Sequence, residues 1–195
     1  MRIGVLALQG SFAEHCAVLH RLQVEAVQVR LPQQLDGLDG LIIPGGESTT
    51  IGKMAVQYGL MDALRDFGRK KAVWGTCAGA IFLSKDAQRD QPLLQLMDIR
   101  VTRNAFGSQA DSFEAALDVE GLGESNGETG PFQAVFIRAP VIAELGANAQ
   151  ALARLADGRI VAARENRWLA TSFHPELTSD TRFHKYFLHM VNPGE

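Results

Sequence analysis

A single cysteine stands in the segment WGTCAGA, residues 74–80, at a point where the predicted structure changes. The apolar residues before Cys77 predict a buried strand, and those after it predict a helix. Small flanking residues allow a side chain to stand exposed at such a sharp turn, as in a nucleophile elbow. The new helix offers unpaired N–H groups and the positive end of its dipole, which favour a thiolate. The pattern therefore predicts that Cys77 is a nucleophile, with sulfur in place of a serine oxygen.

A histidine and a glutamate follow another apolar run, in the segment SFHPE at residues 172–176. A thiolate that attacks a carbonyl carbon needs a nearby imidazole, which takes up a proton and later returns it to the leaving group. His174 is the candidate for this role. At an extended strand end, Glu176 would lie on the same side two residues later and could hold the imidazole in the useful tautomer. The alternative is a buried cysteine and a strand-end histidine that never meet, which the elbow around Cys77 disfavours.

A glycine-rich turn, PGGESTT at residues 44–50, also follows an apolar run and opens a predicted helix. Adjacent glycines let backbone N–H groups face an incoming oxygen, as an oxyanion hole requires. We expect Gly45 or Gly46 to supply one donor and the N–H of Ala78 to supply the other. A phosphate cradle is the alternative for such a turn. It is disfavoured because no P-loop lysine follows and Glu47 would place negative charge beside the phosphate.

The composition of the chain limits its size class and its partners. Its 195 residues, 46% of them hydrophobic, are enough to bury one sizeable core, so we expect one domain. A net charge of -3 without a basic block gives no reason to expect nucleic acid or an acidic membrane surface as a partner. A small molecule or another protein is therefore the expected partner.

The cysteines and histidines indicate the cellular setting and argue against a metal site. The chain has two cysteines, no cleavable leader pattern and no apolar run long enough to span a bilayer. These features predict free thiols in a reduced cytoplasmic setting, with Cys16 packed in the core. Histidines of two predicted helices are five residues apart, which does not place both rings on one helix face, so no metal site is expected. These pairs are His15 with His20 and His184 with His189.

Short apolar runs alternate with amphipathic segments, which is the pattern of a largely parallel sheet covered by helices. The expected strands of this part are residues 3–8, 26–29, 40–43 and 72–74. Helices are expected from about Ser11, near Ser48, near Leu60 and around Phe183 and Phe187. Between residues 98 and 163 the pattern changes to strands and turns, which predicts an antiparallel addition. Its expected strands are residues 99–102, 115–119, 134–137 and 160–163.

Two segments together resemble the class I glutamine amidotransferases, whose triad is Cys, His and Glu. They are GTCAG at residues 75–79 and FHPE at residues 173–176. Further segments narrow the resemblance to the glutaminase subunits of pyridoxal 5′-phosphate synthases, and the similarity covers nearly the whole chain. These segments are PGGESTT at 44–50, RNAFG at 103–107, DSFE at 111–114 and FIRAP at 136–140.

The resemblance implies a fold and a domain organisation. The fold is an α/β three-layer, flavodoxin-like sandwich, in which a mostly parallel central sheet has helices on both faces and an antiparallel addition. Residues 1–195 would form a single class I glutamine amidotransferase domain. The chain departs from the family at Ala105, where a serine is common, and in the glycine-rich loop 121–130, which is longer than usual. Both departures bear on the fit of a partner more than on the chemistry.

The resemblance also implies roles for individual residues. Cys77 would attack the side-chain amide of L-glutamine, His174 would act as general base and acid, and Glu176 would orient it. An arginine can clamp the carboxylate of a free amino acid, and a carboxylate can meet its ammonium group. The positions that match the glutamine-contacting segments of the family are Gly46, Glu47, Ser48, Arg103, Ile137 and Arg138.

In the resembled family, the glutaminase passes ammonia along a sheltered route to a barrel-shaped synthase subunit within a large hetero-oligomer. The glutaminase itself needs no cofactor. One alternative for this chain is a non-catalytic α/β module whose cysteine senses oxidation, although such a module would not need His174 and Glu176 at this spacing. An esterase-like hydrolase with a cysteine nucleophile is a further alternative. It is disfavoured because its acid would come from a separate loop before the histidine.

Overall fold

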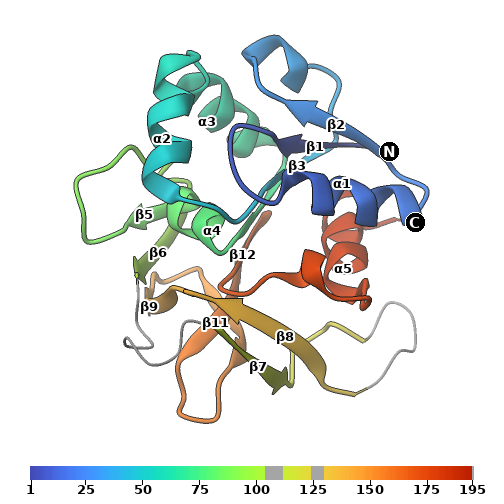
Figure 1. The fold of residues 1–195 in the computed structure, drawn as a ribbon, viewed down its shortest axis with the longest axis vertical. Helices are drawn as coiled ribbons and strands as arrows, with labels where there is room; N and C mark the ends of the chain where they lie inside the picture. Colours follow the sequence, from blue (N-terminus) through green and yellow to red (C-terminus); the bar gives the residue numbers. More distant parts are fainter. Residues whose placement is uncertain (104–111, 124–129, 195) are drawn as a thin grey trace.

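The structure is a computed structural model that describes residues 1–103, 112–123 and 130–194. In these residues a ten-stranded mixed sheet carries the fold, and a separate two-stranded sheet lies beside it (Figure 1). Ala105 and most of the glycine-rich loop 121–130, where the sequence departs from the resembled family, lie outside the described residues.

Five neighbouring strands of the large sheet run parallel, in the order β2-β1-β3-β4-β12. They are β1 (Arg2–Leu6), β2 (Glu25–Val29), β3 (Gly40–Ile43), β4 (Ala72–Thr76) and β12 (Trp168–Thr171). Strands β3 and β4 are buried along their whole length, as expected of parallel strands that are covered on both faces. The order is that of a flavodoxin-like sheet, which confirms the predicted α/β fold.

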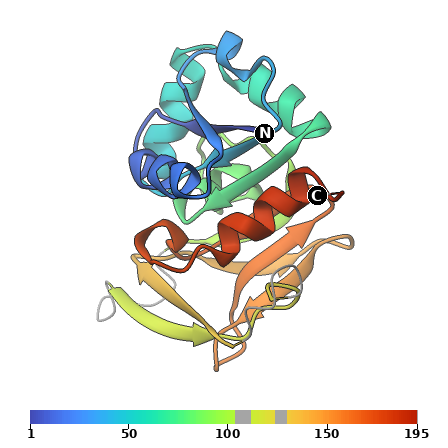
Figure 2. The same cartoon turned by 90° about the vertical axis from the view of Figure 1, so that its right-hand side faces the viewer.

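The other half of the sheet contains the predicted antiparallel addition. Its antiparallel strands are β6 (Met97–Thr102), β9 (Val141–Leu145), β10 (Gln150–Arg154) and β11 (Ile160–Glu165), and the edge strand β5 (Ser84–Asp86) pairs with β6 in parallel. The two-stranded sheet pairs β7 (Ser112–Leu117) with β8 (Phe132–Ile137). Figure 2 shows this hairpin at the end of the molecule opposite the first helices of the chain. The sequence did not predict β5, β9 or β10, because these strands show no regular alternation of buried and exposed residues.

The helices cover the two faces of the parallel strands, which completes the three predicted layers (Figure 1). On one face lie α1 (Phe12–Arg21) and α5 (Arg182–Val191), coloured blue and red. On the other lie α2 (Ser48–Gln57), α3 (Met61–Lys70) and α4 (Ala78–Leu83). Two short 3₁₀ helices, η1 (Pro32–Leu35) and η2 (Pro175–Leu177), complete the helical elements of the described chain. No helix in the described segments is long and apolar enough to cross a bilayer.

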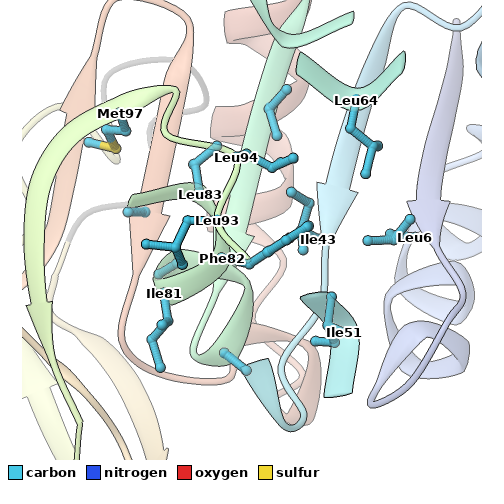
Figure 3. Packing of buried hydrophobic residues seen from close by; sticks show 14 of the residues in the cluster. Leu6, Ile43, Ile51, Leu64, Ile81, Phe82, Leu83, Leu93, Leu94 and Met97 are labelled. Carbon is cyan, nitrogen blue, oxygen red and sulfur yellow. The ribbon is translucent and has the colours of Figure 1, made fainter. Parts of the chain in front are cut away.

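Each helical layer encloses its own apolar core against the sheet. Beneath α2, α3 and α4 the buried side chains are aliphatic apart from Phe82 and Met97, and Figure 3 shows how side chains such as Ile43 and Ile51 meet there. Beneath α1 and α5 it is aromatic, and Trp74, Phe183 and Phe187 are fully buried. Each such side chain contributes roughly 1.5–3 kcal/mol through its removal from water. Cys16 is 7% exposed in the second core, as predicted.

The parallel strands all end at the same edge of the sheet, where ligands bind in open α/β folds. The segments after β1, β3, β4 and β12 meet at this edge. The register pairs Thr76 with Thr171, so the chain leaves β4 and β12 at neighbouring points. Cys77 directly follows the first of these strands and His174 follows the second, although they are far apart in the sequence. The fold therefore brings the predicted nucleophile and base to one place.

Candidate active site

Cys77 occupies the turn between β4 and α4 in a backbone conformation that is rare for a residue with a side chain. Its φ of 48° and ψ of -106° lie outside the common regions, and such strain is concentrated at functional sites. The turn is held because Cys77 N–H donates to the carbonyl of Thr171 at 2.7 Å, while Cys77 O accepts from Ala80 N at 3.1 Å. These bonds form the predicted elbow and fix the direction of the thiol.

The thiol is more enclosed than the sequence analysis predicted. Cys77 is only 6% exposed, because the end of β8 and the glycine turn lie against it. The carbonyl of Ile137, at the end of β8, lies 4.0 Å from the sulfur. The sequence predicts the elbow from local residues, whereas the segments that bury the thiol are distant from Cys77 in the chain.

The His174 side chain joins the thiol to Glu176. It hydrogen-bonds with Cys77, and its Nδ1 lies 2.7 Å from Oε1 of Glu176. The backbone N–H of His174 donates to the carbonyl of Val135 in β8 at 2.8 Å, which fixes the loop after β12. The two side chains meet as predicted, but not from an extended strand end. Pro175 begins the 3₁₀ helix η2, with His174 as its N-cap, because the fixed φ of proline suits the first helical turn.

Glu176 is a buried carboxylate with donors from separate parts of the chain. Its Oε1 accepts from the hydroxyl of Ser11 at 2.6 Å as well as from His174. Its other oxygen, Oε2, lies 3.4 Å from Nε2 of His15. Sequence reasoning did not identify Ser11 or His15 as site residues. The expected helix from about Ser11 follows the first expected strand, which gave only an indirect signal that Ser11 and His15 would reach this edge.

The protonation of the triad follows from these contacts. Burial by itself lowers the pKa of His174, but its interactions with Cys77 and Glu176 outweigh burial and raise the pKa to about 10. Burial by itself raises the pKa of Glu176, but the influence of His15 and the hydrogen bonds from His174 and Ser11 lower it to about 2. At neutral pH, His174 therefore holds a proton between the sulfur and a carboxylate that remains ionised.

We expect the acid stability of the protein to depend on Glu176. The pKa of Glu176 falls from 4.5 to about 2 on folding, so its stabilising contribution is present above about 4.5 and is lost as the pH falls toward 2. Urea unfolding of the wild type and of Glu176→Gln at a series of pH values measures this contribution. The variant should lose less free energy of unfolding on acidification. Equal losses would contradict the assignment of this carboxylate.

His174 should have the opposite effect on stability. Its pKa rises from 6.5 to about 10 on folding, so its contribution is present below about 6.5 and is lost as the pH rises toward 10. Both contributions to the free energy of unfolding are therefore fully present between about pH 4.5 and pH 6.5.

The glycine turn after β3 lies against the two reacting side chains. A Cβ atom added to Gly45 would lie 2.4 Å from Cε1 of His174 and 3.3 Å from Cβ of Cys77, so glycine is required by this close approach. The carbonyl of Gly45 accepts from Ser11 N–H at 3.1 Å. Because the peptide is trans, the N–H of Gly46 points away from Ser11. Ala78 is the first residue of α4, and its N–H is among the donors that have no partner within the helix.

The predicted substrate-contacting residues lie on segments around this edge. Glu47 and Arg103 form an ion pair with 3.2 Å between Oε2 and Nη2, and their side chains are 48% and 19% exposed. Ser48 is buried, and its hydroxyl lies 3.3 Å from the Gln91 side-chain amide. This contact turns the Ser48 side chain toward the protein.

The end of the β8 strand supplies the remaining predicted contacts. Ile137 is 37% exposed, with its carbonyl directed at Cys77. Arg138 is exposed at a φ of 43°, an uncommon conformation for a residue other than glycine. The structure thus places Ile137 beside the nucleophile and leaves the Arg138 side chain accessible to solvent. Gln9 was not predicted as a site residue, yet its side-chain oxygen accepts from Glu47 N–H at 2.7 Å and supports the glycine turn.

The five-residue spacing within α1 and within α5 does not decide which histidines meet. Instead, His15 of α1 meets His184 of α5, with 3.0 Å between Nδ1 and Nε2. In the described part of the chain, no group of three or more His, Cys, Asp or Glu side chains is arranged to hold a metal ion.

Comparison with known proteins identifies the family. Residues 5–193 match the SNO glutamine amidotransferase family. The chain belongs to this family. Among the relatives of this SNO family chain, pyridoxal 5′-phosphate synthase subunit PdxT of Roseiflexus sp. (strain RS-1) is 55% identical, and the match covers 97% of the chain and 100% of the relative. The protein of the same name from Chloroflexus aurantiacus is 52% identical, over 97% of the chain and 100% of the relative.

Solved structures agree with the family assignment. The SNO family chain superposes on a crystal structure of a glutamine amidotransferase with a TM-score of 0.89 and 51% identity, covering 97% of this chain and 98% of the other. The structure of PurLQS from Thermotoga maritima matches with a TM-score of 0.70 at 14% identity, over 98% of each chain, and so supports the fold alone. The resemblance stated from the sequence motifs is confirmed, as is the class I amidotransferase-like fold.

Proposed function

We propose that this SNO family chain hydrolyses L-glutamine to L-glutamate and ammonia at a triad of Cys77, His174 and Glu176. Membership of a glutamine amidotransferase family, together with the identity to pyridoxal 5′-phosphate synthase subunits, makes the chain a glutaminase that supplies ammonia for pyridoxal 5′-phosphate synthesis. The observation that supports the residue assignment is the buried His174 imidazole, which contacts both the thiol and Glu176.

In the first step of the proposed reaction, the lone pair of the Cys77 thiolate attacks the side-chain amide carbon of glutamine and forms a C–S bond. The C–N bond then breaks, and the departing nitrogen takes the proton held by His174, so that ammonia leaves and a glutamyl thioester remains. The raised pKa of His174 supports this order, because the imidazole begins the reaction protonated beside the sulfur.

In the second step, neutral His174 removes a proton from water, and the hydroxide oxygen attacks the thioester carbon. The C–S bond breaks, and the thiolate is restored beside a protonated imidazole. The new carboxyl group gives its proton to solvent, and glutamate leaves. Glu176 stays ionised throughout and stabilises the positive charge of His174 from the far side of the ring. Neither step as written uses a cofactor.

Each tetrahedral intermediate carries a negative oxygen that requires donors. We assign this oxyanion hole to the N–H groups of Gly46 and Ala78. The bond between Ser11 and the Gly45 carbonyl supports the assignment, because it fixes the orientation of the peptide whose other end is the Gly46 N–H. Close approach of Gly45 to Cys77 places this peptide beside the nucleophile.

Substrate recognition is proposed for Gly46, Glu47, Ser48, Arg103, Ile137 and Arg138. The ion pair between Glu47 and Arg103 offers both charges that a free amino acid needs: a carboxylate for its ammonium group and a guanidinium for its carboxylate. The two side chains bind one another in the described structure. When glutamine binds, its ammonium and carboxylate groups would replace this ion pair with one contact to each side chain.

Arg103→Ala is expected to raise KM for glutamine by about tenfold while changing kcat little, since the lost interaction is present in the ground state and in the transition state. Steady-state glutamate release measures both constants. Arg100→Ala serves as a matched control, because Arg100 lies on the preceding strand β6 and pairs with Asp86 and Glu144. An unchanged KM in Arg103→Ala would remove this residue from the substrate site.

The wider setting of the chain is also a proposal. We infer a single amidotransferase domain over residues 1–195, supported by one main sheet with a core on each face. The two cysteines are free, which supports a cytoplasmic location. The relatives are named as subunits of a synthase. We therefore propose that this chain delivers ammonia to a barrel-shaped synthase subunit within a large hetero-oligomer.

The direct test is an assay of glutamate and ammonia with glutamine as substrate, using the purified chain alone and together with the synthase subunit. We expect the two products in equal amounts, and we expect their release by the complex to require Cys77, which forms the thioester. A wild-type complex that releases no glutamate would overturn the proposed function.

A further inference from the structure

Two fully buried histidines lie behind the proposed triad and have no part in the reaction described above. His15 belongs to α1 and His184 belongs to α5, and neither side chain is exposed to solvent. Their rings are 3.0 Å apart between Nδ1 of His15 and Nε2 of His184. Trp74 packs edge-on against both rings, with centroid distances of 5.7 and 5.0 Å. The pair is therefore held rigidly in the aromatic core.

The second ring nitrogen of His15 faces the triad. Its Nε2 lies 3.4 Å from Oε2 of Glu176 and 3.3 Å from the hydroxyl oxygen of Thr76, the residue before Cys77. His15 thus touches both the carboxylate that orients His174 and the strand that carries the nucleophile. At 3.4 Å the contact with Glu176 is longer than an aligned hydrogen bond, so its attraction is mainly electrostatic.

The hydrogen-bond pattern favours one arrangement of protons. Because His15 and His184 share a close nitrogen contact, one ring donates and the other accepts. If His15 donated from Nδ1, its Nε2 would turn a lone pair toward the Glu176 carboxylate, and a buried N–H of His184 would lack a partner. If His184 donates from Nε2, His15 carries its proton on Nε2 and directs it at Glu176 Oε2 and Thr76. The unpartnered Nδ1 of His184 is then an acceptor, which is consistent with its lack of a hydrogen bond among the described residues.

Both histidines are neutral donors in this arrangement. Burial lowers the pKa of His15, and it lowers the pKa of His184 well below the usual value. The groups that face Glu176 are His174 from its own loop and His15 from α1, with Cys77 behind His174 and His184 behind His15. Glu14 and Arg21 of α1 act on this cluster only through longer-range charge.

We propose that His15, oriented by His184, is a positioning residue for the glutaminase reaction. Its Nε2–H attracts Oε2 of Glu176 across 3.4 Å and limits rotation of the carboxylate, so that Oε1 stays directed at Nδ1 of His174. Ser11 and His174 both bind Oε1, whereas Oε2 has no hydrogen-bond partner among the described residues and lies 3.4 Å from Nε2 of His15. The terminal torsion of a glutamate is broad, so a carboxylate held at one oxygen could rotate. This proposal rests on the proposed glutaminase function.

Two variants with amide side chains distinguish the roles of the two ring nitrogens of His15. The amide nitrogen of His15→Gln takes the place of Nε2 and can still donate toward Glu176. The shorter amide of His15→Asn takes the place of Nδ1 and reaches His184 instead. Both variants keep a polar side chain in the core, so their comparison does not depend on removal of the ring alone. Cys16→Ala is the control, because it opens space on the same helix without touching the triad.

Glutamate release by the complex with the synthase subunit is measured against glutamine concentration and pH. We expect His15→Asn to lower kcat by about tenfold to a hundredfold with KM unchanged, because a misplaced catalytic group affects the reaction step. The acid limb of its kcat profile should move to higher pH, since Glu176 has lost a donor to its ionised form. His15→Gln should keep kcat within a few-fold of wild type and retain the wild-type acid limb. Cys16→Ala should leave both unchanged.

Two outcomes would overturn the positioning role. One is an equal kcat and an equal pH profile for His15→Asn and His15→Gln. The other is a His15→Asn variant whose melting temperature is lower but whose kcat and pH profile match those of wild type. If both variants fail to fold, His184→Gln, which keeps a donor toward His15, must retain the wild-type acid limb or the proposal fails. Failure of the glutaminase function is recognised separately, because wild type itself would then release no glutamate.

Discussion

Cys77→Ala is expected to reduce glutamate release by about a thousandfold or more, because the variant cannot form the thioester and the remaining triad residues have no nucleophile to serve. Alanine keeps a Cβ atom and fits the backbone of the elbow with the same strain as cysteine. The fold and the binding of the synthase subunit should therefore survive. Glutamate release and co-purification with the synthase subunit measure the two properties.

Cys16→Ala is the control for this substitution. It removes the other thiol of the chain, which is buried under α1 and whose pKa is raised by burial. An unreactive structural thiol is expected at this position. The control should retain glutaminase activity, and treatment of wild type with a thiol-alkylating reagent should modify Cys77 as activity disappears. Full activity in Cys77→Ala would refute the cysteine mechanism.

Gly45→Ala is expected to reduce kcat/KM by about a hundredfold, because the added methyl group would occupy space that the His174 ring needs. The new Cβ would stand 2.4 Å from Cε1 of His174, well inside contact distance, and 3.3 Å from Cβ of Cys77. The imidazole must move or the glycine turn must withdraw. Either shift separates the base from the nucleophile or displaces the proposed oxyanion donor at Gly46. Kinetics of glutamate release at saturating and limiting glutamine measure the loss.

Gly59→Ala is the matched control for Gly45→Ala. Gly59 has a φ of 65° at the end of α2, and no atom lies within 4 Å of the Cβ that alanine would add there. The substitution should cost about 1–2 kcal/mol of stability through backbone strain, yet leave catalysis intact. Comparable activity losses in the two variants would show that Gly45 acts through general stability. A loss confined to Gly45→Ala supports its close packing against the triad.

The buried carboxylate and imidazole explain why the proposed active site is sensitive to such small changes. His174 and Glu176 each lose contact with water on burial, and their charged forms are stabilised instead by specific neighbours. A displaced neighbour therefore changes a protonation state as well as a distance. The same coupling links the pH dependence of stability to that of catalysis. Exposed ion pairs of this chain, such as Arg69 with Asp66, carry no comparable consequence.

Local sequence was sufficient to predict the elements that carry the proposed triad. The β4–Cys77–α4 elbow follows from an apolar run and small neighbours, because a residue in a sharp strand-to-helix turn is constrained by the residues beside it. The His174–Glu176 contact was also predicted, since the two residues are close in the chain. Its backbone was not, because Pro175 starts a 3₁₀ turn in place of an extended end.

Only the tertiary structure decided which distant residues join that triad. The five-residue spacing of His15 and His20 gave no reason to connect His15 with His184, which lies 169 positions away. Periodicity reports which face of a helix is buried, but it does not report which other element covers that face. The packing of α1 and α5 on one side of the sheet brings His15 to Glu176 and Ser11 to the glycine turn. Short-range steric constraints thus determine the local backbone around the reacting groups. Long-range packing determines which residues surround these groups and how their pKa values shift.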